Sequence, residues 1–146
     1  MFFVNFILAA LAGALVPIQA GINSTLRSFT GSPYYATLIS VFVSTVSMAL
    51  FCAITRTPVP SFESMAKMPW WGWTGGVVGV VFVCLILTLA PKLGATALIA
   101  TVITGQLFCS IILDQFAWLG FAQHALTVNR MIGIALLGAG VYFIAK

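Results

Sequence analysis

The chain has 146 residues, of which 62% are hydrophobic and 5% charged, and its formal net charge is +4. Soluble domains contain about 25% charged residues, so this composition indicates a membrane protein. The basic residues are scattered, which excludes the basic cluster that nucleic-acid binding needs. Three cysteines without paired spacing and a single histidine speak against a metal or redox centre, and we expect no cofactor.

Apolar runs of about 20 residues, the length that crosses a bilayer, follow one another along the chain. They predict an all-α membrane protein with one transmembrane domain, residues 1–146, and five spans at residues 2–20, 34–54, 70–90, 94–113 and 129–145. The first run lacks the positively charged start of a secretory signal, so we expect a retained span. Turn formers in “NSTLRSFTGSP” predict the first loop, and “APK” predicts a tight turn before the fourth span.

The first span carries amide side chains where a membrane helix is normally apolar. At about 100° per residue, Asn5, Gln19 and Asn23 share one face of this helix. Pro17 removes a hydrogen-bond donor from the span and predicts a kink. Polar groups inside a bilayer are costly unless they are bonded or functional. The three amides are therefore candidate solute contacts, with hydrogen bonding between helices as the alternative.

The second and third spans carry small and hydroxyl-bearing residues. Four hydroxyls share one broad face of the second span, at Thr37, Ser40, Ser44 and Ser47. Packing with the hydroxyls bonded back to their own helix is favoured over the lining of a cavity. The third span opens with two GxxxG pairs, Gly72 with Gly76 and Gly75 with Gly79, a pattern that indicates close helix packing.

A second polar stripe lies on the fourth span, where Gln106, Ser110 and Asp114 are four residues apart and share a face. Gln106 and Ser110 are further candidate solute contacts. Asp114 lies near the end of this span, and Arg130 begins the fifth span on the same side. We favour a structural ion pair between them, with Asp114 as a carrier of a proton or cation as the alternative.

The basic residues divide evenly between the two sides that five spans define. The N-terminal side carries Arg56, Lys67 and Arg130, and the opposite side carries Arg27, Lys92 and Lys146, three against three. The positive-inside rule has no excess to act on. Either the balance is accidental, or the chain inserts in both orientations and pairs as an antiparallel homodimer. No nucleophile with a base and an orienting group is recognisable, so we expect no catalytic residue and no enzyme.

Three segments resemble the YdcZ-type family, half-length bacterial proteins of the drug/metabolite transporter superfamily: “PIQAGINSTL”, “APKLGATALIATVITGQLFCSIILDQF” and “NRMIGIALLGAGVYF”. The resemblance implies a chain of the bacterial inner membrane that pairs with itself or a similar chain. The pair would form a ten-helix fold with an inverted repeat. The small multidrug exporters of this superfamily have a glutamate in their first span. This chain lacks that glutamate, so their proton exchange is not carried over.

These observations predict a secondary transporter of a small polar solute. Two oppositely oriented copies would alternate access to a site near the membrane midplane. The site would contain Gln19, Asn23, Gln106 and Ser110, and its expected partners are a second chain, the lipid bilayer and the solute. A dual-topology channel lined by the hydroxyl face of the second span is the alternative. A membrane partner without transport activity is a third class.

Overall fold

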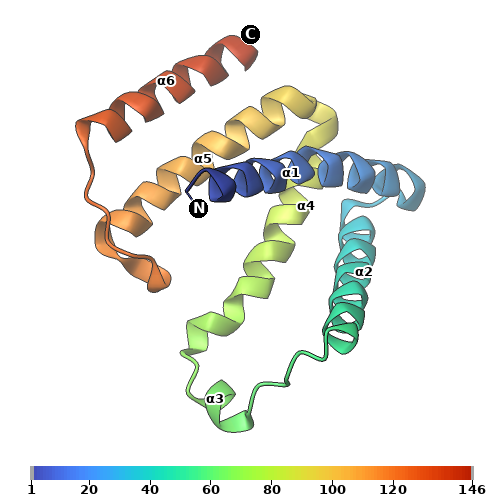
Figure 1. Cartoon of the computed structure of the whole chain (residues 1–146). Coiled ribbons are helices and arrows are strands. Elements are labelled where there is room, and N and C mark those ends of the chain that lie inside the picture. The colour runs from blue at the N-terminus through green and yellow to red at the C-terminus, as the bar shows by residue number, and fades with distance from the viewer. Residues whose placement is uncertain (1, 146) are drawn as a thin grey trace. The chain divides into compact units, whose positions relative to one another are not determined.

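The structure, a computed structural model, describes residues 2–145, and its regular elements are all helical (Figure 1). They are α1 (Phe2–Thr30), α2 (Pro33–Ile54), α3 (Phe62–Ala66), the 3₁₀ helix η1 (Trp70–Thr74), α4 (Gly75–Leu93), α5 (Ala95–Phe116), the 3₁₀ helix η2 (Trp118–Gly120) and α6 (Val128–Ala145). The all-helical fold expected from the sequence is confirmed for these residues. The chain divides into two compact units, Met1–Pro91 and Lys92–Lys146.

Four helical segments are long and apolar enough to cross a bilayer. They are Phe3–Thr30, Pro33–Ile54, Trp70–Leu93 and Ala95–Phe116. The helix Val128–Ile144 is apolar but shorter, so the fifth span stays a prediction. Lys146, which the charge count placed on the C-terminal side, lies outside the described residues.

The first helix is longer than the sequence predicted, because α1 continues through Pro17 and beyond Ala20 to Thr30. The polar residues expected to form a loop are helical, since their hydroxyls bond to carbonyls of their own helix. Thr25 Oγ1 donates to Gly21 O at 3.2 Å, and Ser28 Oγ donates to Thr25 O at 2.7 Å. The helix ends at Gly31, whose φ of 67° suits a residue without a Cβ. Its N–H donates to Arg27 O at 2.9 Å.

The turn between the third and fourth spans is also displaced from its predicted place. The “APK” segment, residues 90–92, belongs to α4, which ends only at Leu93. Gly94, with φ 74°, makes the turn instead, because this left-handed conformation favours glycine. At its other end α5 extends past Leu113 to Phe116, and Ala117 caps it in the left-handed region. Asp114 is therefore helical.

The segment between α2 and α4 is more ordered than its prolines suggested. Ser61 caps α3 by accepting a hydrogen bond from Ser64 N at 3.2 Å. The third span begins in η1, which contains Gly72, and only then becomes α-helical at Gly75. A Cβ added at Gly76 or Gly79 would meet no described atom within 4 Å. The close helix packing expected from the GxxxG pairs is thus absent among the described residues.

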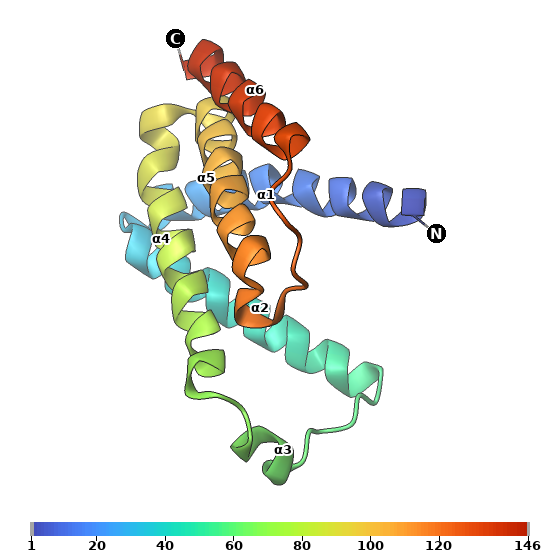
Figure 2. The ribbon, with the colours of Figure 1, turned by 90° about the vertical axis from the view of Figure 1, so that its left-hand side faces the viewer.

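Unit 1 is held together where α1, α2 and α4 meet. Arg27 Nη1 donates to Leu87 O at 2.8 Å, which joins α1 to α4. Cys84 Sγ lies 3.3 Å from Thr37 Oγ1, which joins α4 to α2. The buried side chains of Ala36 and Leu87 lie at this junction. Figures 1 and 2 show α2 and α4 leaving the junction, with their far ends connected by the segment that contains α3.

Candidate solute-binding site

A cavity of about 580 Å³ lies between α1, α2 and α4 of unit 1. Pockets for small molecules measure roughly 300–1,000 Å³, so this one has the size of a metabolite site. The polar groups on its wall are Gln19 of α1 and Ser40, Ser44 and Thr45 of α2. The other lining residues are Val41, Met48, Ala49, Cys52, Gly76, Gly79, Val80 and Val83. The lining carries no charged side chain.

The hydroxyls on the α2 wall present acceptors to the cavity. Ser44 Oγ donates to Ser40 O at 2.9 Å, and Thr45 Oγ1 donates to Val41 O at 2.9 Å. Because a hydroxyl has one hydrogen and two lone pairs, both groups keep the capacity to accept a hydrogen bond. Gln19 adds an amide with two donors and an acceptor. The wall can therefore both donate and accept hydrogen bonds without providing a charge.

The glycines of α4 form an open side of this cavity. Gly76 and Gly79 line it, and no described atom lies within 4 Å of a Cβ built at either position. Their GxxxG spacing predicts helix packing, which requires a neighbouring backbone in the same space. In the structure their missing side chains leave volume for a ligand beside Gln19.

Asn23 lies in a smaller space that Gln19 also borders. This cavity, of about 20 Å³, is lined by Val16, Gln19, Ala20, Asn23, Phe82, Val83 and Ile86. A volume of roughly 10–15 Å³ is enough for one water molecule. Asn23 is only 7% exposed, and its side chain makes no hydrogen bond to another described residue. The two amides thus share a space in which a single water could bridge them.

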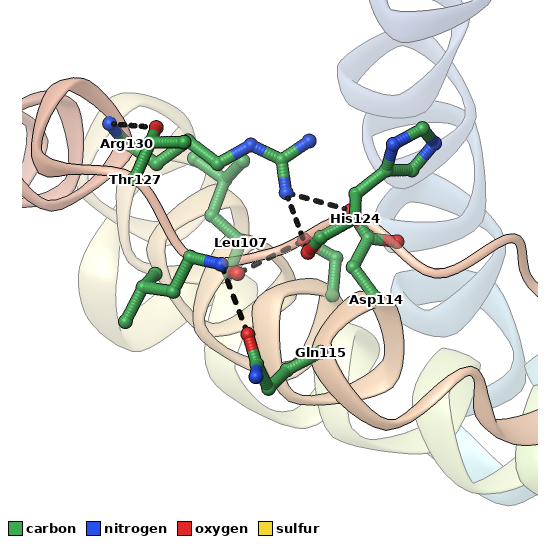
Figure 3. A network of polar contacts seen from close by, with 8 residues as sticks. Leu107, Asp114, Gln115, His124, Thr127 and Arg130 are labelled. Carbon is green, nitrogen blue, oxygen red and sulfur yellow. Dashed lines mark hydrogen bonds and ion pairs between the residues drawn. The ribbon is translucent and has the colours of Figure 1, made fainter.

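Unit 2 brings Asp114 and Arg130 together, as Figure 3 shows. Arg130 Nη1 lies 3.2 Å from Asp114 Oδ2, and it also donates to His124 O at 3.4 Å. His124 N in turn donates to Asp114 O at 3.0 Å. Gln115 Oε1 accepts a hydrogen bond from Leu126 N at 2.9 Å. These contacts tie the connection between η2 and α6 to the end of α5, which is a structural use of the charges.

The remaining predicted site residues lie apart from these groups. Asn5 is exposed on α1 and lines none of the cavities described above. Gln106 and Ser110 are exposed on α5 in unit 2, where Ser110 Oγ donates to Leu107 O at 2.9 Å. The structure thus places Gln19 and Asn23 together, and it adds Ser40, Ser44 and Thr45 to them. The hydroxyl pattern of the second span was the sequence signal for these additions, although packing was the favoured interpretation.

Replacing Arg130 with glutamine is expected to loosen the connection at residues 121–127. The pair is partly exposed, with side-chain exposures of 38% for Arg130 and 24% for Asp114. We therefore expect the free energy of unfolding to fall by about 1 kcal/mol. Hydrogen exchange by mass spectrometry should show faster exchange in this segment, including the His124 amide. Lys67→Gln is the control. The Lys67–Glu63 pair is highly exposed, so this variant should leave hydrogen exchange at residues 121–127 unchanged. Equal exchange in both variants would contradict the assigned role.

Long apolar helices beside an uncharged, largely apolar cavity with a few polar groups define a membrane-embedded helical protein with room for a small solute. The chain matches the family model DMT_YdcZ, described as “Putative inner membrane exporter, YdcZ”, over residues 4–143. The chain therefore belongs to the YdcZ family, which confirms the resemblance seen in the sequence. Membership places it among membrane transport proteins. No curated protein and no solved structure gives a significant match to it.

Proposed function

We propose that the chain is one half of a secondary transporter that moves a small polar solute across the bacterial inner membrane. The observation that carries this proposal is the cavity of about 580 Å³ with Gln19 facing the hydroxyls of α2. The wall is largely apolar, and its few amide and hydroxyl groups can replace part of the hydration of a neutral solute. Since the wall provides no charge, it favours a neutral solute over a bare ion.

Gln19 is the proposed primary solute contact, with Ser40 and Ser44 on the opposite wall. Asn23 is retained as a further proposed contact, because it shares the smaller adjoining space with Gln19. A solute hydroxyl or amide would exchange water for the Gln19 amide and the serine oxygens. Gln106 and Ser110 of α5, and Asn5 of α1, are retained as further proposed contacts. Asp114 has no proposed coupling role, because its carboxylate is engaged by Arg130.

The proposed assembly is an antiparallel homodimer of five-span chains that alternates access to the cavity. The even division of basic residues supports insertion in both orientations. The apolar helices also require partners of some kind, since only four apolar side chains are buried among the described residues: Ala36, Ile86, Leu87 and Leu98. Lipid would cover part of this surface and the second copy another part. A similar chain could replace that copy.

A dual-topology channel is the second candidate, because Ser40 and Ser44 line a hollow wall of α2. The two candidates differ in kinetics. A carrier must change conformation in each cycle, which limits it to about 10³ solutes per second or fewer. A channel passes solute much faster. A carrier also exchanges labelled solute against unlabelled solute across the membrane, whereas an open pore has no such coupling.

The experiment that tests the proposal begins with a thermal-shift screen of purified protein against neutral amino acids, amides and polyols. A compound that binds the folded state raises the unfolding temperature. The best compound is then supplied with a radiolabel to vesicles that contain the protein. We expect saturable uptake that is stimulated by unlabelled compound inside. Uptake without saturation or exchange would favour the channel, and no uptake with any stabilising compound would contradict both.

A further inference from the structure

We propose that Arg27 binds a phosphate group in a second cavity of unit 1, as a site separate from the solute cavity. This cavity measures about 370 Å³ and is lined by Ser24, Arg27, Ser28, Gly31 and Pro91. It shares no lining residue with the cavity around Gln19. In the sequence, Arg27 stands out only as one of the basic residues that flank the spans. The inference does not depend on the proposed transport function.

The guanidinium of Arg27 is held by a backbone carbonyl of α4 that lacks its usual partner within the helix. Pro91 has no N–H, so it cannot donate to the carbonyl of Leu87 four residues earlier. Arg27 Nη1 supplies the missing donor, at 2.8 Å from Leu87 O. Leu87 is fully buried, and an unpaired buried carbonyl would be costly. A guanidinium has five N–H donors, so this bond orients the group and leaves others for a ligand.

The charge of Arg27 pairs with no carboxylate among the residues that the structure describes. The sequence contains two acidic residues. Glu63 is paired with Lys67 at 2.6 Å, and Asp114 is paired with Arg130 at 3.2 Å. Arg27 is partly buried at the end of a long apolar helix, where an unpaired cation is unfavourable. Among the described side chains no other anion remains, which leaves the Arg27 charge available to an anionic ligand.

The chemistry of the cavity favours a phosphate group. The planar guanidinium matches two phosphate oxygens, and the hydroxyls of Ser24 and Ser28 also line the space. The C-terminal end of α1 carries partial negative charge, which opposes an anion. That effect is reduced here, because Gly31 N donates to Arg27 O at 2.9 Å and Thr30 Oγ1 donates to Leu26 O at 3.1 Å.

The phosphate could belong to a lipid head group at the membrane boundary or to a soluble phosphate ester. Native mass spectrometry of the purified protein in neutral detergent tests the site with phosphatidylglycerol, phosphatidylcholine and glycerol phosphate. We expect retained phosphatidylglycerol or glycerol phosphate on the wild type, reduced at least about tenfold by Arg27→Gln. Competition between the two compounds identifies the source. Displacement of the lipid by millimolar glycerol phosphate indicates a soluble ester, and persistence indicates a lipid.

Two further variants keep the test independent of folding. Ser24→Leu fills the cavity while leaving Arg27 bonded to Leu87, and it should also reduce binding about tenfold. Arg56→Gln removes the same charge from an exposed loop position and should leave binding at the wild-type level. Thermal unfolding verifies that each variant is folded. Equal binding by wild type, Arg27→Gln and Ser24→Leu would overturn the proposal, as would an equal loss in Arg56→Gln.

Discussion

Replacing Gln19 with leucine is expected to weaken solute binding about 10- to 100-fold while the protein remains folded. The change removes the only amide that faces the hydroxyls of α2 in the cavity of about 580 Å³. A solute group left without its partner loses about 1–3 kcal/mol. The thermal shift produced by the compound found in the screen should disappear at concentrations that saturate the wild type. Uptake into vesicles should fall by a similar factor.

Two companion variants separate the cavity from a general effect of polarity. Thr25→Val also removes a polar group from α1, but its hydroxyl is bonded to Gly21 O within the helix, so solute binding should be unchanged. Ser44→Leu fills the cavity from its α2 wall and should abolish binding as Gln19→Leu does. Normal binding by Gln19→Leu would remove this residue from the site. Normal binding by both cavity variants would remove the cavity itself from the proposed function.

Variants with more basic residues on one side of the membrane than on the other are expected to lose transport when expressed alone. Transport should return when two variants with opposite shifts are expressed together. Val59→Lys with Phe62→Lys changes two exposed positions between α2 and α4 and raises the N-terminal side from three basic residues to five, against three. Arg56→Ser with Lys67→Ser lowers that side from three to one. The positive-inside rule then fixes opposite orientations for the two chains. An antiparallel dimer requires one chain of each kind.

Reporters at the C-terminus provide the measurement for this experiment. The unmodified chain should be detected on both sides of the membrane, and each altered chain on one side only. Solute uptake should be near background for either altered chain and near the wild-type level when both are expressed together. Full uptake by one altered chain alone would contradict the antiparallel assembly. A wild-type reporter found on a single side would contradict dual topology.

The sequence predicted the helices well because long apolar runs leave few other structures in a bilayer. It predicted two helix ends wrongly, and both errors concern polar residues or proline. Thr25 and Ser28 were expected in a loop, but their hydroxyls bond to carbonyls of α1. Pro91 was expected in a turn, yet α4 continues because the carbonyl of Leu87 finds a donor in Arg27. Such compensations come from tertiary contacts, which periodicity cannot show.

The candidate site was predictable only in part for the same reason. Gln19 and Asn23 are conspicuous as amides within an apolar span, and their spacing places them on one helix face. The role of Ser44 depends on how far α4 lies from α2, and that distance is not encoded in either helix alone. Gly79 shows what the sequence leaves open. Its GxxxG spacing with Gly75 is equally compatible with a tightly packed helix and with an open cavity wall.

The connection between α1 and α2 has a consequence for the biosynthesis of the protein. Only Gly31 and Ser32 separate the two helices, and two residues reach at most about 7 Å, far less than a hydrocarbon core of about 30 Å. Two membrane-spanning helices joined by so short a connection form one hairpin, with both connected ends on the same face of the bilayer. Such a hairpin inserts as a unit, so its two helices share one orientation and neither can reverse it alone.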